Sequence, residues 1–224
     1  AASRFCRTSE EVLDFLEKAT AARPTSSQLW VHRIDGLAKR GMNAQALEAA
    51  VQAEATNPGD VTILEALART QARSGDYVQA LGNYGKLATM VPDSSVPYLG
   101  QVAVYAATKD WPRAMSAAQR AVEVAPDAIA GYVWLVKAAS RSGRMDLAYS
   151  TAQAIQKRWP ADSEGYLSEA RLMTKEKRDA DVEQVLRRGM AGSQGITIVM
   201  QLVKFLEAHQ IGRASCRERV CYVV

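Results

Sequence analysis

Apolar residues recur along the chain at spacings of three and four, the spacing that places them on one face of an amphipathic helix. The helical stretches come in pairs, and a proline recurs every 34 residues, at Pro24, Pro58, Pro92, Pro126 and Pro160. Five prolines at one interval indicate an internal repeat. A period of 34 residues is typical of an array of two-helix units, so the pattern predicts an all-helical protein.

Alignment on these prolines predicts five full repeats, with a half repeat before them at 9–26 and another after them at 197–210. The full repeats are 27–60, 61–94, 95–128, 129–162 and 163–196. Counting from the start of each repeat, position 20 holds a small residue that lets two helices approach closely, namely Ala46, Ala80, Ala114, Ala148 and Val182. Gly41, Gly75 and Gly143 fall between the two helices, where a left-handed residue ends a helix.

One repeat, 61–94, carries a recognisable set of residues: Leu64, Leu67, Ala68, Gly75, Asp76, Tyr77, Ala80, Tyr84 and Pro92. This set resembles the tetratricopeptide repeat (TPR) family, and the resemblance extends over about residues 9–210. It implies an α-solenoid of stacked helix-turn-helix units forming a right-handed superhelix. Arg33, Gln101 and Glu169 depart from the family at a position that is usually leucine, and repeat 163–196 lacks both the hinge glycine and the closing proline.

The two ends of the array differ from its middle. Neither half repeat supplies a solubilising cap with a polar outer face, so we expect an interior part of a longer protein whose end helices can self-associate. Ile211–Val220 resembles one reading frame of a sequencing-library adapter, so residues 211–224 are expected to be a non-native tail. Without that tail the formal net charge falls from +4 to +2, which removes the argument for a nucleic-acid partner.

Composition and motifs narrow the function. Hydrophobic residues make up 48% of the chain and charged residues 23%, and no apolar run is long enough for a membrane span. His32 and His209 are far apart, and neither lies near a cysteine or carboxylate pair at metal-ligand spacing. Gly82 and Gly85 fall within a predicted helix and not in a phosphate-binding loop. We therefore expect no enzyme, no metal and no cofactor.

The resemblance implies a functional surface, because positions 2, 5, 6, 9, 12 and 13 of each first helix line the concave groove in the TPR family. Positions 9 and 13 share a helix face and hold basic pairs in several repeats. The predicted partner-binding residues are Lys39, Arg69, Arg73, Leu99, Val133, Trp134, Lys137, Arg141, Arg171 and Lys175. Basic side chains around an apolar middle suit an acidic peptide with an apolar anchor.

Two other interpretations of these residues remain open at this point. Lysine and arginine near a helix C-terminus are also favoured by the helix dipole, and Trp134 could pack against a neighbouring helix. Chaperone-clamping members of the family carry asparagine at positions 6 and 9. This sequence has none there, so that activity is not expected.

The sequence thus predicts a non-catalytic protein-protein interaction scaffold that binds an acidic protein or peptide segment. The alanine-rich, glutamine-bearing repeats also resemble bacterial TPR proteins of exopolysaccharide and protein-export systems, which implies the cell envelope or periplasm, with the cytoplasm left open. The alternative is a regulatory TPR segment of a larger multidomain enzyme.

Overall fold

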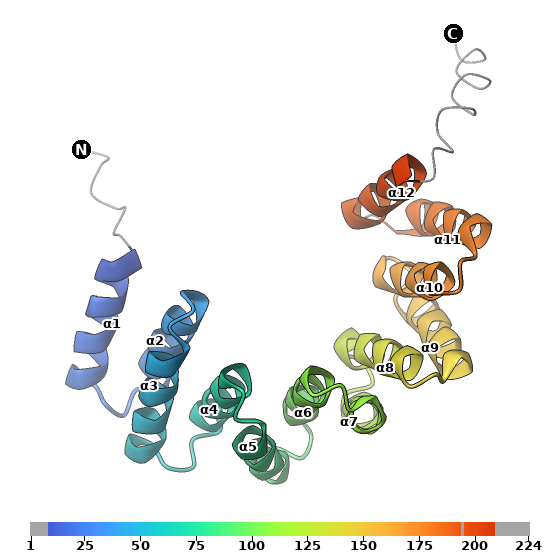
Figure 1. Cartoon of the computed structure of the whole chain (residues 1–224). Helices are drawn as coiled ribbons and strands as arrows, with labels where there is room; N and C mark the ends of the chain where they lie inside the picture. The colour runs from blue at the N-terminus through green and yellow to red at the C-terminus, as the bar shows by residue number, and fades with distance from the viewer. Residues whose placement is uncertain (1–8, 194, 209–224) are drawn as a thin grey trace, which may run out of the picture. The chain divides into compact units, whose positions relative to one another are not determined.

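The computed structural model of the chain describes residues 9–193 and 195–208, and this part consists of twelve α-helices without a β-strand (Figure 1). The predicted all-α, solenoid fold class is confirmed. The predicted tail, 211–224, lies outside the described residues, as do the last two residues of the predicted half repeat 197–210, His209 and Gln210.

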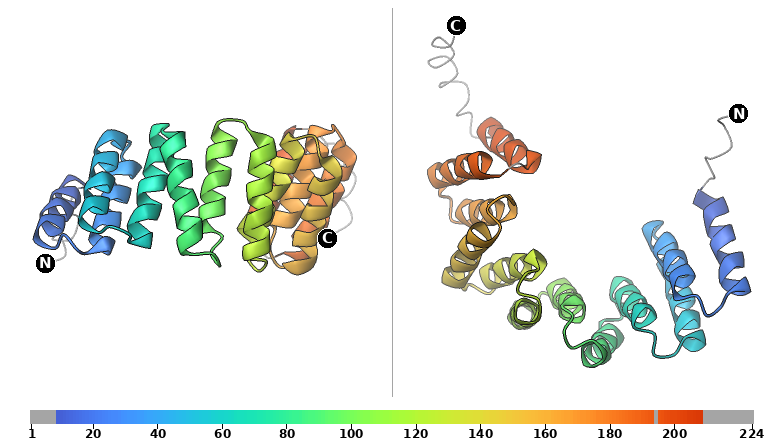
Figure 2. Two further views of the ribbon diagram at one scale, coloured as in Figure 1. Left: turned by 90° about the horizontal axis from the view of Figure 1, so that it is seen from below. Right: turned by 180° about the vertical axis from the view of Figure 1, so that it is seen from behind.

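The helices follow the 34-residue period as pairs. In order they are α2 (Ser27–Lys39) and α3 (Asn43–Thr56), α4 (Val61–Ser74) and α5 (Tyr77–Met90), α6 (Val96–Ala107) and α7 (Trp111–Val124), α8 (Ile129–Arg141) and α9 (Met145–Arg158), and α10 (Glu164–Lys175) and α11 (Asp179–Gly192). A single helix, α1 (Ser9–Ala22), precedes them, and α12 (Ile196–Ala208) follows. Consecutive helices run in alternating directions from α1 to α7 and again from α8 to α12 (Figure 2).

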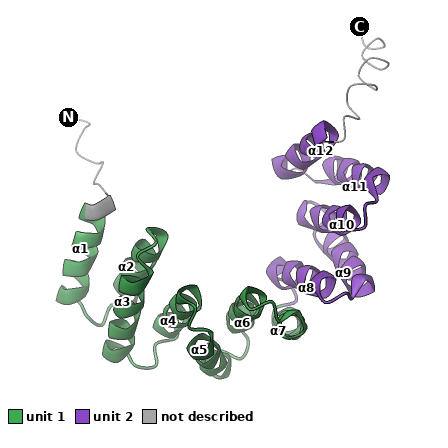
Figure 3. Cartoon of the chain, viewed as in Figure 1, with its two compact units in different colours: residues 1–125 green, residues 126–224 purple. Residues whose placement is uncertain are grey.

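The helices form two compact bodies, residues 1–125 and 126–224 (Figure 3). In the N-terminal body, α4 contacts both α2 and α6, so the first helices of the repeats form one layer. In the C-terminal body, α10 contacts α8 in the same way. The second helices lie behind that layer in each body. We call the surface formed by the first helices of one body its first-helix face.

The hinge between the two helices of a repeat has the same geometry in all five full repeats. Position 15 is left-handed at Gly41, Gly75 and Gly143, with φ of 75°, 86° and 78°, and also at Lys109 and Lys177, with φ of 59° and 61°. The next residue donates its N–H to the carbonyl five residues earlier, as in Asp76 to Gln71 at 2.9 Å and Arg178 to Met173 at 3.0 Å. This is a Schellman-type helix end, and two repeats form it without glycine.

The small side chains at position 20 lie at the centre of the helix packing. Ala46, Ala80, Ala114 and Ala148 are completely buried, and Val182 is 2% exposed. Glycine serves the same purpose at Gly100 of α6, where an added Cβ would lie 2.2 Å from Cε1 of Tyr84 on α5. Close approach at these points positions each first helix against its neighbours, and so fixes the first-helix face.

Two of the polar residues at the position that is usually leucine, Arg33 and Glu169, have polar partners. Arg33 donates to Oγ1 of Thr20 at 3.2 Å and to Oε1 of Glu17 at 3.3 Å. Glu169 is only 5% exposed, and its Oε2 accepts a hydrogen bond from Nε2 of Gln156 at 2.8 Å. These pairs satisfy polar groups that would otherwise be costly to bury.

One helix start carries a well-defined cap. Asp60 precedes α4, and its Oδ1 accepts the N–H groups of Thr62 at 2.8 Å and Ile63 at 3.0 Å. Its other oxygen accepts the hydroxyl of Ser27 at 2.6 Å. The hydrogen bond from Ser27, together with the two N–H groups, lowers the pKa of Asp60 below its ordinary value. The carboxylate therefore links α2 to the start of α4.

Candidate functional site

A cavity of about 530 Å³ opens between α8 and α10 in the C-terminal body. Its lining residues are Val133, Val136, Lys137, Ser140, Arg141, Ser168, Arg171, Leu172 and Lys175. Val136 and Leu172 are 4% exposed and form an apolar floor, whereas the four basic side chains are exposed. No carboxylate is among the described residues that line it. We call this cavity the basic pocket.

The repeat pattern explains why four cationic side chains meet here. Lys137 and Arg141 occupy positions 9 and 13 of repeat 129–162, and Arg171 and Lys175 occupy the same positions of repeat 163–196. Residues four apart share a helix face, and α8 and α10 are in contact. Equivalent positions of the two helices therefore surround one cavity.

Lys175 is held in place by the end of α8. Its Nζ donates to the carbonyl oxygen of Ser140 at 2.6 Å and lies 3.3 Å from the hydroxyl oxygen of the same residue. Carbonyl groups at a helix C-terminus carry partial negative charge, which favours an ammonium group there. The lysine side chain is thereby ordered before any ligand arrives, and ordering it on binding costs less entropy.

Two more of the basic side chains have partners on the first-helix face. Arg171 NH1 lies 2.5 Å from Oε1 of Glu164, in a pair whose arginine side chain is 61% exposed. Such exposed ion pairs contribute little, so a ligand carboxylate can compete for this arginine. Nζ of Lys137 lies 4.3 Å from the centroid of the Trp134 ring, a cation–π contact.

Trp134 itself lies beside the basic pocket. It is half-buried and lines a shallow depression with Ile129, Ala130, Val133, Asp162 and Glu164. Val133 borders both this depression and the basic pocket. The indole ring therefore forms a partly exposed apolar surface next to the cationic side chains.

The predicted residues of the N-terminal body have different surroundings. Arg69 pairs with Asp35 at 2.9 Å and with Glu65 at 3.0 Å, so two carboxylates offset its charge. Lys39 and Arg73 are exposed, and Leu99 is half-buried. Because Arg69 connects α4 to α2 through an ion pair, an arginine at this position contributes to helix stacking as well as to any ligand contact.

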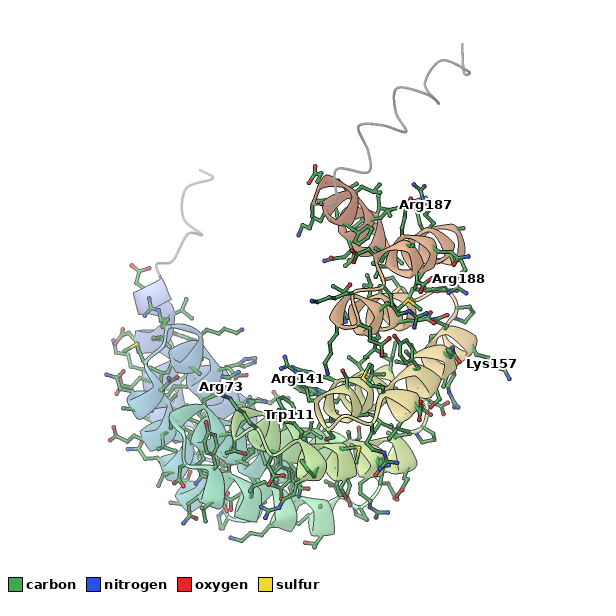
Figure 4. All side chains as sticks on the ribbon, turned by 45° about the vertical axis from the view of Figure 1, so that its right-hand side comes forward. Arg73, Trp111, Arg141, Lys157, Arg187 and Arg188 are labelled. Atoms are coloured by element: carbon green, nitrogen blue, oxygen red, sulfur yellow. The ribbon has the colours of Figure 1, made fainter. Side chains whose placement is uncertain are left out.

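Figure 4 distinguishes the two sides of each body. Arg73 and Arg141 project on the first-helix side of their respective bodies, whereas Lys157, Arg187 and Arg188 project from α9 and α11 on the other side. Positive charge is thus present on both sides of the C-terminal body. What distinguishes the first-helix side is the convergence of four basic side chains on one cavity.

Sequence reasoning named five of the residues that line the basic pocket, Val133, Lys137, Arg141, Arg171 and Lys175, and missed four. Ser140 and Ser168 occupy positions 12 and 6, which are among the positions that line the groove in TPR proteins, so the same positional rule could have identified them. Val136 and Leu172 occupy positions 8 and 10, and their apolar character resembles that of ordinary core residues.

Residues 9–193 and 195–208 contain no group of three or more histidine, cysteine or acidic side chains arranged to hold a metal ion. His32 is exposed on α2, and Gly82 and Gly85 lie inside α5. Within the same part of the chain, no helix has both the length and the apolar character needed to cross a bilayer.

Neither a protein-family model nor a curated protein matches the sequence. Solved structures do match the fold. Yeast Tom70 superposes with a TM-score of 0.71 at 15% identity, over 98% of this chain and 46% of its own. A tetratricopeptide repeat protein from Parabacteroides merdae superposes with a TM-score of 0.68 at 17% identity, over 90% of this chain and 80% of that protein's chain.

A third neighbour is YrrB, described as a TPR protein with an unusual peptide-binding site. It gives a TM-score of 0.57 at 14% identity, over 87% of this chain and 97% of its own. The chain spans less than half the length of Tom70 but nearly all of YrrB. At these identities the likeness is one of fold, and the chain therefore has the α-solenoid fold of tetratricopeptide repeat proteins.

Proposed function

We propose that this protein is a non-catalytic interaction scaffold that binds an acidic segment of a partner protein in the basic pocket. The observation that carries the proposal is the convergence of Lys137, Arg141, Arg171 and Lys175 on one cavity with an apolar floor. The TPR-like fold, shared with a neighbour described as having a peptide-binding site, supports a peptide or protein as the ligand.

Physical chemistry favours carboxylates as the groups recognised. Arginine presents a planar set of donors that matches a carboxylate in a bidentate arrangement, and Arg141 and Arg171 come from different helices. A cavity lined by one sign of charge raises the local concentration of oppositely charged ligands. The apolar floor then takes up aliphatic parts of the bound segment, so both charge and shape contribute to selection.

The proposed wider setting of this scaffold rests on the resemblance of its repeats to those of bacterial TPR proteins. Its alanine-rich repeats support a place in a bacterial envelope or export assembly, where the pocket would recruit an acidic segment of another component. In the alternative setting, a regulatory segment of a larger multidomain enzyme, the same pocket would bind an acidic segment of that enzyme or its substrate protein.

The proposal is tested by measuring the affinity of the full chain for fluorescent peptides that are acidic, neutral or basic. The variant Lys137→Glu/Arg141→Glu should bind the acidic peptide at least about 10-fold more weakly than wild type. The matched control, Lys157→Glu/Arg187→Glu, makes the same change in net charge on the second-helix side and should bind nearly as wild type (Figure 4).

A second control addresses the basic tail. The variant Arg213→Gln/Arg217→Gln/Arg219→Gln should keep the selectivity for acidic peptides, because the proposed site does not include these residues. Equal loss of binding in both charge-reversal variants would show attraction to net charge alone and would contradict a site in the basic pocket.

A further inference from the structure

A second cavity, of about 390 Å³, opens between α10 and α12 on the first-helix face of the C-terminal body. Leu167, Val182 and Leu186, all 3% exposed or less, form its floor, and Phe205 forms part of its wall. Arg171, Thr174, Gln201 and Lys204 lie among its exposed lining residues. We call it the apolar pocket.

The two pockets are neighbours on the same surface. Arg171 lines both of them, with the basic pocket on the α8 side of α10 and the apolar pocket on the α12 side. A segment bound in the basic pocket that continues past Arg171 therefore reaches the apolar pocket directly.

The repeat pattern shows how this surface changes in character. Position 9 is Lys137 in α8 and Arg171 in α10, and the equivalent residue of α12 in the half repeat 197–210 is Phe205. Along the face, two exposed cationic side chains are followed by a buried aromatic one, which borders the apolar pocket. A ligand complementary to this order presents acidic residues first and an apolar side chain after them.

We propose that the partner segment carries an aromatic or large aliphatic side chain that fills the apolar pocket while its acidic residues occupy the basic pocket. This inference rests on the proposed function. Packed helices lie about 10 Å apart, and an extended chain advances about 3.3 Å per residue. Because α8 and α10 are in contact, the ligand is an extended segment with acidic residues about three positions apart, and its apolar anchor follows the second of them toward α12.

The rim of the apolar pocket also fits this ligand. Lys204 and Arg171 border the cavity, so acidic residues on either side of the anchor meet positive charge. The outward face of α12, which exposes Ile196, Val199, Met200 and Val203, is a separate apolar surface whose residues do not line the pocket. It serves as the internal control.

The test compares two acidic peptides on the full chain, one with phenylalanine at the anchor position and one with serine there. A third peptide carries the phenylalanine at the opposite end, so that both chain directions are covered. Burying a phenylalanine should raise affinity about 10-fold or more over the serine peptide in one direction. Gln201→Trp fills the apolar pocket and should abolish this gain, whereas Met200→Trp adds the same side chain to the outward face and should preserve it.

Circular dichroism establishes that both tryptophan variants are folded. An equal gain in wild type and Gln201→Trp, or its loss in Met200→Trp, would overturn the inference by placing the anchor elsewhere. Phenylalanine and serine peptides of equal affinity would also overturn it. In that case the proposed function would still be supported if the serine peptide bound Lys137→Glu/Arg141→Glu more weakly than wild type. If no acidic peptide bound to wild type, the proposed function and the inference about the anchor would both be refuted.

Discussion

Replacing Gly100 with alanine should destabilise the N-terminal body, although alanine is the better helix former. A Cβ at this position would lie 2.2 Å from Cε1 and 2.3 Å from Cζ of Tyr84. Carbon atoms in good contact are about 3.5–4.0 Å apart, so the overlap exceeds about 1 Å. Tyr84 is only 5% exposed, so its ring has little room to move.

The magnitude follows from two opposing terms. Overpacking a filled core costs about 1–3 kcal/mol. The helix gains up to about 1 kcal/mol when alanine replaces glycine. An overlap above about 1 Å puts the cost in the upper part of that range, about 2–3 kcal/mol, so the net loss for Gly100→Ala is about 1–2 kcal/mol. Each kcal/mol should lower the melting temperature of a chain of this size by about 2–4 °C.

The assay is urea and thermal unfolding followed by circular dichroism, with Gly82→Ala as the matched control. Gly82 is also inside a helix, α5, but apart from its chain neighbours and the adjacent backbone of that helix, no atom lies within 4 Å of a Cβ built on it. Gly82→Ala should therefore stabilise the protein by up to about 1 kcal/mol. If Gly100→Ala were as stable as wild type while Gly82→Ala behaved as expected, the close approach of α6 to Tyr84 would be refuted.

Three further predictions concern single side chains. Asp60→Ala should cost about 1 kcal/mol of stability at neutral pH through loss of the cap. Because the pKa of Asp60 is lowered in the folded state, this penalty should shrink as pH falls through about 4 and below. Urea midpoints that show the same penalty at every pH would contradict the lowered pKa. The pKa of Tyr149 is raised to about 12, mainly by burial and then by the hydrogen bond that its hydroxyl donates to Glu176 at 2.7 Å. Tyr149→Phe should therefore leave the phenolate absorbance of the folded protein unchanged at pH 10. A loss of phenolate absorbance in this variant at pH 10 would refute the raised pKa. Lys177→Gly should raise stability by about 0.5–1 kcal/mol, because it removes the backbone strain of a lysine in the left-handed conformation. A lower melting temperature of this variant would show that the lysine side chain stabilises the hinge through other contacts.

The repeat period was sufficient to predict the helices, because each 34-residue unit repeats the same apolar positions. It did not reveal that repeats without a hinge glycine keep the same turn. Lys109 and Lys177 adopt the left-handed conformation there, since the Schellman-type hydrogen bond and the packing of the two helices impose it. Tertiary context overrides the local preference of lysine.

The residue type alone did not show which basic side chains have their charge offset by a carboxylate and which do not. Arg69 and Lys137 both occupy position 9, but position 9 of the preceding repeat is Asp35 for Arg69 and Ala103 for Lys137. Stacking brings Asp35 within 2.9 Å of Arg69, so its charge is offset. Comparing each position with its equivalent 34 residues earlier would have identified this ion pair from the sequence.

The hydrogen bond between Lys175 and the carbonyl of Ser140 could not be predicted in the same way. It joins position 13 of one repeat to a backbone oxygen at position 12 of the preceding one, and it depends on the path of a long side chain. The cavity between α8 and α10 likewise depends on how Val136, Ser168 and Leu172 fill the space between the helices, which periodicity does not specify.

The measurement that tests the central claim most directly is a charge exchange between pocket and ligand. Wild type should bind an acidic peptide and reject its lysine-substituted counterpart, with affinity falling as sodium chloride rises from about 50 mM to about 500 mM. Lys137→Glu/Arg141→Glu brings the pocket from four positive charges to a net charge of zero and should abolish this preference, while Lys157→Glu/Arg187→Glu should retain it. If the pocket variant kept the wild-type preference for the acidic peptide, recognition in the basic pocket would be contradicted.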